Sequence, residues 1–406
     1  MDTVLWAWSG MTVLALVAWT SRHFQLSRAA RVMPPLDSTM YASDDGALPT
    51  VSLLVAAKDE AANIEACVRS LVEQDYPRLD VIAVNDRSGD ETGAILDRLA
   101  AQSDRLTALH VRELRPGWFG KNNAMREGLE RAGGEWLCFT DADCVQTCPR
   151  SLTIAMRYAL EKGVDFLSVL PAHETKGFWE SIIQPACSGI LMIWFNPLYV
   201  NNPARRTAYA NGAFMLMRRS CYEAIGGHDA VKTELNEDMH MARRAKEAGQ
   251  RLRVVSNVDL YTVRMYDGFA QTRAGWSRIF YGCFGTLRRL IVTAVMVVLV
   301  SLLPWVALAA SLGAVLADAA PDRTWRALLV ASAATCLMQM TVMLRFYRLN
   351  RLHPVYALAY PLGVAIGLWA LVGAIRRLGG RSTTTWRGTT YRGDRVEPTV
   401  QAISAK

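Results

Sequence analysis

The stretch that decides the fold is 135–144, EWLCFTDADC, in which a predicted strand (135–140) runs into two aspartates. In α/β sheets, ligands bind at the carboxyl ends of the strands, so Asp141 and Asp143 stand where a ligand is expected. Because only Ala142 separates them, both carboxylates can face one point. Mg²⁺ uses one or two carboxylates and takes further oxygens from substrate phosphates. The alternative is an ordinary Asp turn, since aspartate also nucleates turns.

Upstream of this stretch, segments with strand-like and helix-like patterns alternate. Between residues 64 and 72, apolar residues recur at the spacing of one helix face. The expected strands are 51–57, 79–85 and 106–111, and a helix over 121–132 ends at Gly133-Gly134. The fold class predicted is therefore α/β, with a mostly parallel sheet covered by helices on both faces.

Four apolar runs indicate a membrane protein. They are residues 4–19, 291–317, 326–344 and 354–375. Each is long enough, at ~1.5 Å per residue, to cross a hydrocarbon core of ~30 Å. The first run follows an acidic start and precedes basic residues, unlike a signal peptide, so we expect a retained N-terminal anchor and about three C-terminal transmembrane helices.

Basic residues predict how the chain is oriented in the cytoplasmic membrane. Arginines that follow the first run and precede the second place residues 23–289, the catalytic part, in the cytoplasm. Four spans would leave the tail outside, whereas four arginines of that tail favour the inside: Arg376, Arg377, Arg381 and Arg387. Either the tail breaks the rule or one C-terminal run only dips into the bilayer, and the sequence does not decide.

Charge and cysteine content narrow the partners. The net charge of +8 suits anionic lipid headgroups, and no nucleic-acid-binding motif appears, so nucleic acid is not an expected partner. The eight cysteines are scattered in a chain that faces a reducing compartment, so no disulfides are expected. Cys144 and Cys148 lack a second Cys or His pair and do not predict a zinc site.

Six ordered blocks resemble the family 2 glycosyltransferases of GT-A fold. They are VSLLVAAKDEAANI (51–64), VIAVNDRSGDET (81–92), GKNNAMREGL (120–129), FTDADC (139–144), NGAFMLMRRSCYEAIGG (211–227) and NEDMHMARRAKEAG (236–249). The flanking spans are similar to those of the branch that glycosylates membrane lipids, which includes ceramide glucosyltransferase and the carotenoid- and hopanoid-associated enzymes. The resemblance implies a hexosyltransferase that inverts the sugar while transferring it once from a nucleotide-diphosphate sugar, with a UDP-sugar as the expected donor. The acceptor is a lipid hydroxyl and the cofactor Mg²⁺ or Mn²⁺.

The resemblance also implies roles for individual residues. The matching positions are Asp59, Glu60 and Asp86 for the nucleotide; Lys121 for phosphate; Asp143 and Asp141 for the metal, with Asp141 alternatively on the ribose; Asn211 and Gly212 under the donor sugar and acceptor; and Glu237 and Asp238 for catalysis, with Asp238 as the base. Asn85 departs from the double Asp common in the family. A near-normal or depressed pKa suffices for Asp238, because the departing diphosphate drives the reaction.

The region beside the spans bears on the acceptor. Processive synthases of the family carry Gln-x-x-Arg-Trp, whereas this chain has Gln271, Arg273 and Trp276 at another spacing, which favours a single addition. Arg264, Arg273 and Trp276 are expected at the diphosphate or acceptor. Residues 177–200 are apolar but interrupted by polar residues and prolines, which suits a segment in the membrane interface, with ordinary core as the alternative.

The expected domains are an anchor (1–22), a juxtamembrane linker (23–49), the glycosyltransferase domain (50–270), an amphipathic interfacial segment (271–289), a transmembrane region (290–375) and a basic tail (376–406). The tail sequence TTTWRGTTYR (383–392) resembles an ending of lipid-glycosylating relatives, without an assigned role. The competing functions are a processive polysaccharide synthase, a polyprenyl-phosphate sugar transferase, a transporter and a binding protein that has lost its chemistry. The transporter is disfavoured because the three C-terminal runs carry almost no polar residues.

Overall fold

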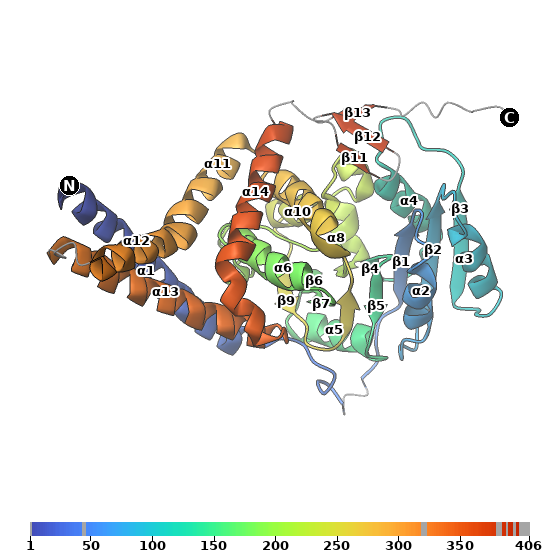
Figure 1. Cartoon of the computed structure of the whole chain (residues 1–406). Coiled ribbons are helices and arrows are strands. Elements are labelled where there is room, and N and C mark those ends of the chain that lie inside the picture. The colour runs from blue at the N-terminus through green and yellow to red at the C-terminus, as the bar shows by residue number, and fades with distance from the viewer. Residues whose placement is uncertain are drawn as a thin grey trace. The chain divides into compact units, whose positions relative to one another are not determined.

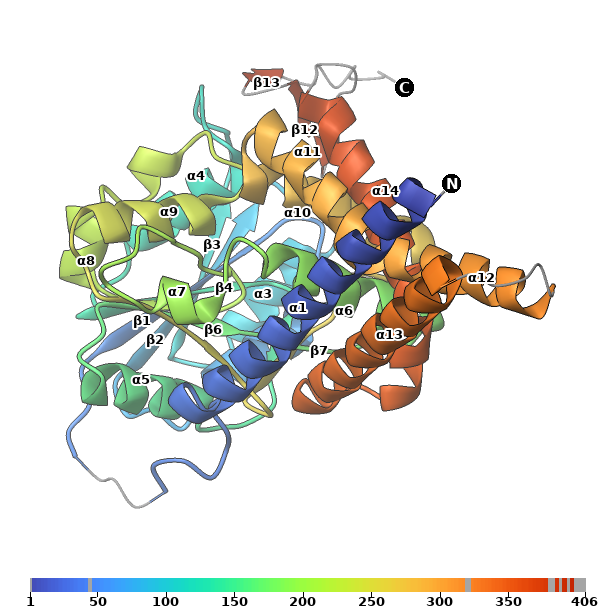
Figure 2. The ribbon, with the colours of Figure 1, turned by 90° about the vertical axis from the view of Figure 1, so that its left-hand side faces the viewer.

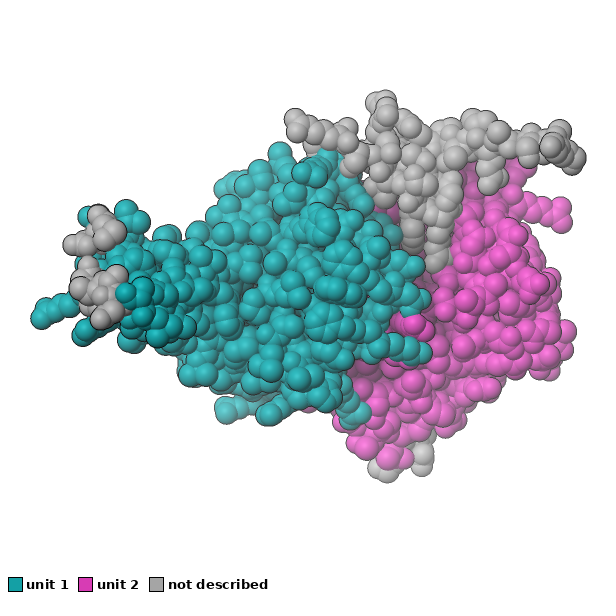
Figure 3. Space-filling view, viewed as in Figure 1, with its two compact units in different colours: residues 1–33, 175–194, 266–379 teal, residues 34–174, 195–265, 380–406 magenta. Residues whose placement is uncertain are grey.

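The computed structural model describes residues 2–42, 46–317 and 323–378, and the backbone of 384–386, 389–392 and 395–397. Figure 1 shows the chain, and Figure 2 shows it turned by 90°. The described residues fall into two compact units, coloured in Figure 3. We call residues 34–174 and 195–265 the sheet unit, and residues 1–33, 175–194 and 266–379 the helical unit.

The sheet unit contains a seven-stranded sheet in the order β3-β2-β1-β4-β8-β6-β9. Its strands are β1 (Val51–Ala57), β2 (Leu79–Asp86), β3 (Leu106–Val111), β4 (Trp136–Asp141), β6 (Phe166–Leu170), β8 (Met215–Arg218) and β9 (Leu252–Ser256). Only β8 runs antiparallel to its neighbours β4 and β6. The predicted α/β fold with a mostly parallel sheet is therefore confirmed.

Helices cover both faces of this sheet. They are α2 (Ile64–Val72), α3 (Thr92–Ala100), α4 (Gly120–Leu129), α5 (Ser151–Glu161), α7 (Pro197–Val200), α8 (Arg219–Ala224), the 3₁₀ helix η1 (His228–Val231) and α9 (Glu237–Glu247). Residues of β1 alternate between two apolar cores, with Leu53 and Val55 in one and Leu54 in the other. This period of two is what a strand buried on both faces requires. Three short strands form a second sheet: β5 (Cys144–Gln146), β7 (Ala172–His173) and β10 (Tyr261–Val263).

The helical unit is built from helices, most of which belong to long apolar stretches. Its elements are α1 (Asp2–Val32), α6 (Phe178–Leu191), α10 (Gly268–Phe284), α11 (Leu287–Met296), the π-helical turn η2 (Val297–Leu302), α12 (Leu303–Leu316), α13 (Arg323–Leu349), the 3₁₀ helix η3 (Pro354–Ala359) and α14 (Tyr360–Leu378). α1 and α12 pack along α13 (Figure 2), whereas α14 packs mainly against α10 and α6.

Within the described residues, four helical stretches are long and apolar enough to cross a membrane, as the sequence predicts. They are Thr3–Val32, Leu287–Leu316, Arg323–Leu349 and Pro354–Leu378. The second combines α11, η2 and α12 into one interrupted helix.

Three further findings concern single predictions. The helix expected over 121–132 ends at Leu129, and the chain then turns through Gly134, where a side chain would lie 2.4 Å from the backbone nitrogen of Ser52. All eight cysteines are buried and carry free thiols. The described residues of the tail belong to an antiparallel sheet of β11 (Thr384–Trp386), β12 (Thr389–Arg392) and β13 (Arg395–Glu397). Two of the four tail arginines, Arg381 and Arg387, lie outside the described residues.

Candidate active site

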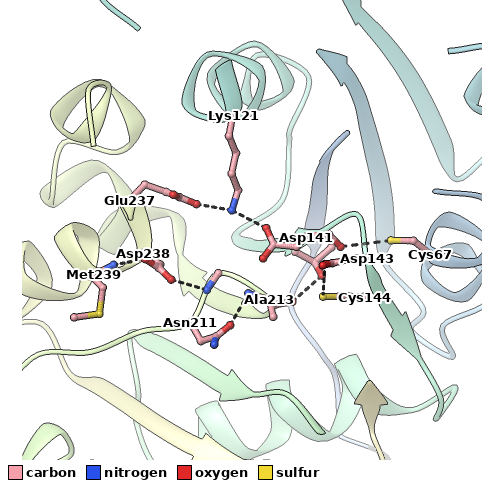
Figure 4. Close-up of polar contacts among 12 residues, drawn as sticks. Cys67, Lys121, Asp141, Asp143, Cys144, Asn211, Ala213, Glu237, Asp238 and Met239 are labelled. Carbon is pink, nitrogen blue, oxygen red and sulfur yellow. Dashed lines mark hydrogen bonds and ion pairs between the residues drawn. The ribbon is translucent and has the colours of Figure 1, made fainter. Parts of the chain in front are cut away.

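Three charged side chains from separate elements meet where β4 ends. Lys121 lies in the first turn of α4, Asp141 is the last residue of β4, and Glu237 opens α9. The Lys121 Nζ atom lies 2.6 Å from Asp141 Oδ1 and 2.6 Å from Glu237 Oε1 (Figure 4). The sequence predicts all three as site residues, and the fold brings them together.

The Lys121 ammonium is held in its charged form. Burial favours the neutral amine, but the charges of Asp141 and Glu237 outweigh it and keep the pKa of Lys121 well above its usual value. The two carboxylates thus share one fixed positive charge, which allows them to lie close together.

Asp238 is the neighbour of Glu237 and faces the same point. Its Oδ2 accepts a hydrogen bond from the Gly212 N–H (2.9 Å), and its Oδ1 accepts one from the Met239 N–H (2.7 Å). Burial and the negative charge of Glu237 raise the pKa of Asp238 to about 7. A near-normal or depressed pKa would suffice for a base, and the pKa of Asp238 is instead raised because its carboxylate is buried next to that of Glu237.

Gly212 lies at the centre of this cluster. A methyl group at this position would lie 3.2 Å from Lys121 Nζ and 3.6 Å from carboxylate oxygens of Asp141 and Asp238. The preceding Asn211 folds its side chain back, so that its Oδ1 accepts a hydrogen bond from the Ala213 N–H (2.9 Å). The predicted loop of Asn211 and Gly212 therefore lies against the charged residues.

Asp143 lies beside Asp141 on the same turn, partly exposed. The Cys144 thiol is 3.8 Å from its Oδ1, and the Cys67 thiol is 3.6 Å from the main-chain oxygen of Asp141. Within the described ranges, no group of three or more His, Cys, Asp or Glu side chains could hold a metal alone. The pair of carboxylates fits a cation of the Mg²⁺ kind, which takes most of its oxygens from substrate and water.

Of the three predicted nucleotide residues, Asp59 and Glu60 follow β1, and Asp86 is the last residue of β2. Asp59 adopts a left-handed backbone conformation (φ 53°), and its Oδ1 accepts a hydrogen bond from the Gly89 N–H (2.8 Å). The Asp86 carboxylate pairs with Arg87 (2.8 Å) and lies where a side chain at Gly120 would be, at the start of α4. Asp59 and Asp86 thus both belong to the rim at the carboxyl ends of the strands.

Glu60 differs from these two. It is buried, and its Oε2 accepts a hydrogen bond from Asn63 Nδ2 (2.9 Å), just before α2 begins. Its main-chain N–H donates to the Thr92 hydroxyl (2.9 Å) at the start of α3. These contacts give Glu60 a structural position between two helix starts.

The expected diphosphate or acceptor residues belong to different units. Arg264 is exposed just after β10 in the sheet unit. In the helical unit, the Arg273 guanidinium stacks on Trp369 (4.4 Å), and Trp276 is buried beside Phe280. Arg273 and Trp276 therefore have packing partners within the helical unit.

Two positioning residues were not predicted. Asn122 Nδ2 donates hydrogen bonds to the main-chain oxygens of Val231 (2.7 Å) and Glu234 (3.0 Å), and so joins α4 to the loop before α9. The Ser168 hydroxyl accepts a hydrogen bond from the Asn211 N–H (2.8 Å). Asn122 stands inside the GKNNA block, which was the one available signal, whereas a lone serine in a strand gives none.

The chain is similar to known glycosyltransferases. A family model described as "Glycosyltransferase like family 2" matches residues 49–276, more than half of the chain. A 4,4′-diaponeurosporenoate glycosyltransferase of Staphylococcus aureus (strain USA300) is 26% identical over 248 residues, which are 60% of this chain and 64% of the relative. The chain thus spans slightly less than two thirds of that relative's length.

Two solved structures are similar at lower identity. A mannosyltransferase of Pyrobaculum calidifontis, in complex with GDP-Man and Mn²⁺, is 22% identical with a TM-score of 0.47, over 80% of this chain and 97% of that one. S. aureus TarS, in complex with UDP-GlcNAc, is 16% identical with a TM-score of 0.40, over 85% of this chain and 97% of the other.

Proposed function

The chain belongs to the family 2 glycosyltransferases, and we propose that it transfers one sugar from a nucleotide-diphosphate sugar to a hydroxyl group of a membrane lipid. The observation that carries this proposal is the position of Asp238. Its carboxylate lies beside Gly212 and Glu237, at the strand ends where Lys121 and Asp141 also meet. A base, a cation and a metal-binding carboxylate within one cluster are what a sugar transfer with a diphosphate leaving group needs.

In the proposed reaction, Asp238 removes the proton of the acceptor hydroxyl. The acceptor oxygen forms a bond to the anomeric carbon, and the bond from that carbon to the diphosphate oxygen breaks, with the electron pair leaving on the diphosphate. Because attack and departure occur on opposite faces of the sugar, the configuration inverts. A pKa near 7 suits a general base that works near neutral pH.

The proposal also assigns roles in metal, phosphate and nucleoside binding to the remaining site residues. Asp143, with Asp141, would hold a Mg²⁺ or Mn²⁺ ion, which supplies positive charge for the leaving diphosphate when bound. Lys121 keeps Asp141 and Glu237 together and stands at a helix N-terminus, where phosphate is favoured. Asp59 and Asp86, on the rim, would accept hydrogen bonds from the nucleoside.

A lipid acceptor is proposed on two grounds. The chain carries four helical stretches apolar enough for a membrane. The S. aureus relative is named as a diaponeurosporenoate glycosyltransferase, which fits a lipid-like acceptor. A cytoplasmic position of the sheet unit is part of the proposal, since nucleotide sugars are made there and basic residues flank the spans.

The test uses purified full-length protein in detergent, radiolabelled UDP- and GDP-sugars, and a total lipid extract. We expect label in one organic-extractable product, lost with a chelator and in Asp238→Asn but kept in Asp104→Asn, an exposed carboxylate before β3. Label in a long water-soluble polymer would instead mean a synthase. Tight nucleotide binding without transfer to any lipid would contradict the proposed activity.

A further inference from the structure

Three apolar segments of the helical unit pack side by side: α1, α11 with α12, and α13. Leu5 of α1, Ala307 of α12 and Leu328 of α13 form one small core. At the opposite end, the Arg345 guanidinium near the end of α13 donates to the Ser27 hydroxyl of α1 (2.6 Å). α1 and α13 therefore run in the same direction, and α11 with α12 runs against them.

Contacts halfway along confirm this register. The main-chain oxygen of Val300, in η2, accepts hydrogen bonds from Trp19 Nε1 and from Gln339 Nε2, both at 3.0 Å. The residue four positions later is Pro304, which has no N–H, so no main-chain donor is available to this carbonyl at the α-helical position. Donors from α1 and α13 satisfy it instead.

One end of this three-helix group is rich in arginine. It comprises the end of α1, the start of α11 and the end of α13, with Arg28, Arg31, Arg288, Arg289, Arg345, Arg348 and Arg351. By the positive-inside rule, this end faces the cytoplasm. We call it the basic end.

α14 begins in the half of the three-helix group that contains the basic end. The ring of Tyr360, its first residue, lies 5.6 Å from the ring of Trp19, and its hydroxyl donates to Ser301 Oγ (3.1 Å). Trp19 is eight residues before Ser27, about 12 Å along α1 at 1.5 Å per residue. The start of α14 is thus well away from Leu5 and the opposite end.

α14 then packs mainly along α6 and α10, and less extensively against α11 and η2 of the three-helix group (Figure 1). Close packing needs its glycines, since a side chain at Gly363 would lie 2.3 Å from the main-chain oxygen of Ile182 in α6. A side chain at Gly373 would lie 2.6 Å from Ser277 Oγ in α10. α14 and α10 run in the same direction, because Trp369 meets Arg273 and Gly373 meets Ser277.

The end of α14 returns to the basic end. The charge of Arg377 interacts with Arg278 and Tyr281 in the second half of α10. After Gly285, α10 leads directly into α11, whose Arg289 lies over the ring of Trp194 (5.5 Å). The last turn of α14 therefore lies near the start of α11.

The middle of α14 gives an independent argument. Trp369, halfway along the helix, carries the Arg273 guanidinium on its ring (4.4 Å). If α14 crossed the bilayer, this arginine would lie near the midplane, where charged side chains are most unfavourable. In the headgroup region, the same stacking of Trp and Arg is favourable.

We propose that α14 does not cross the membrane. α6, α10 and α14 form a layer in the leaflet at the basic end, and the chain after residue 378 lies on the same side as residues 23–289. The exposed apolar residues Leu358 and Leu362 face the acyl chains, Trp369 with its stacked Arg273 lies at the headgroup level, and exposed Arg376 faces anionic headgroups. This arrangement resolves the conflict between four apolar runs and an arginine-rich tail, and it is independent of the reaction catalysed.

The test places single cysteines in the full-length chain and labels them with a membrane-impermeant maleimide in right-side-out and inside-out vesicles. Ala317→Cys follows α12, Asn350→Cys follows α13, and Arg376→Cys ends α14; all three positions are exposed. The unchanged chain is the background control, because its eight thiols are buried. We expect Asn350→Cys and Arg376→Cys to react from the same side and Ala317→Cys from the other.

Reaction of Arg376→Cys from the side of Ala317→Cys would overturn the proposal. A second measurement covers poor labelling at the interface, with alkaline phosphatase or green fluorescent protein fused to the C-terminus of the full chain in Escherichia coli. Fluorescence with an inactive phosphatase is expected, and an active phosphatase without fluorescence would mean that α14 spans the bilayer.

Discussion

The ammonium nitrogen of Lys121 lies 2.6 Å from Glu237 Oε1, one residue before the proposed base Asp238. Glu237 raises the pKa of Asp238 through its negative charge, and Lys121 opposes that effect. Besides the proposed binding of phosphate, the lysine therefore has a second role, because it limits how far the pKa of the base rises.

Replacing Lys121 tests whether this lysine limits the pKa of Asp238. We expect Lys121→Met to lower kcat/KM by about 10²–10³-fold, the usual range for loss of one preorganised charge. The pH at which kcat/KM reaches half its maximum should also rise, because Asp238 loses its positive neighbour. Lys162→Met, on an exposed lysine at the end of α5, is the control and should leave both quantities unchanged. A lower rate with an unmoved pH profile would limit Lys121 to phosphate binding.

The raised pKa of Asp238 predicts two pH dependences. As a base, Asp238 must lose its proton, so kcat/KM should rise as the pH passes through about 7. For stability the sign is opposite: between its ordinary pKa of 3.8 and about 7, the folded state holds a proton that the unfolded state has lost. Folding stability from this group therefore falls as the pH rises through that window. Asp238→Asn should remove both dependences, as followed by transfer rates and thermal unfolding, and a wild-type rate flat across pH 7 would refute this assignment.

The charged residues of the site were predictable because each lies in a block with a strong pattern. Asp141 ends a strand that its run of apolar strand-forming residues indicates, and Glu237 opens a helix. The pairing of Lys121 with both could not be predicted, since no spacing along the chain encodes which segments fold together. The contact of Ser168 with Asn211 is of the same kind.

Some elements of the fold could likewise be predicted from the sequence, and others could not. The predicted strands 51–57 and 106–111 agree with β1 and β3 residue for residue, because each is a short apolar run. The antiparallel β8 was missed, since its four residues, MLMR, lie within a longer block without a strand-like alternation. The sequence also could not place α14, whose apolar composition suits both a span and a helix packed on α6 and α10.

The hydrogen bonds from Gln339 to Val300 predict a stability effect. Gln339→Leu removes a donor from the Val300 carbonyl, to which Pro304 offers no N–H, and it removes the acceptor of Trp305 Nε1 (2.6 Å). We expect a loss of about 1–3 kcal/mol in unfolding free energy, the usual cost of unsatisfied buried polar groups. Thermal unfolding in detergent measures it. Thr341→Val, on an exposed hydroxyl of the same helix, should change little; equal effects of the two variants would argue against the Val300 contact.

Packing of α14 against α6 predicts a difference between two glycines. Gly363→Ala would place a methyl group 2.3 Å from the main-chain oxygen of Ile182, so the helices must separate. Overpacking of this kind costs about 1–3 kcal/mol, and the midpoint of thermal unfolding should fall. Gly313→Ala, on α12, meets nothing within 4 Å and should be neutral or slightly stabilising. If both variants behave alike, α14 does not pack on α6 as described.

The two carboxylates of the Asp141 turn predict different responses to metal. Asp143 is the proposed direct ligand, so Asp143→Ala should raise the Mn²⁺ concentration for half-maximal activity by at least about 10–100-fold, the range seen when groups that orient metal ligands are removed. Asp141→Asn also removes a charge that Lys121 neutralises, so it should change the pH profile as well. Activity titrated with Mn²⁺ after chelation measures both, with Asp104→Ala, an exposed carboxylate before β3, as the control. An unaltered metal dependence in Asp143→Ala, together with weaker nucleotide binding, would move Asp143 from the metal to the nucleotide.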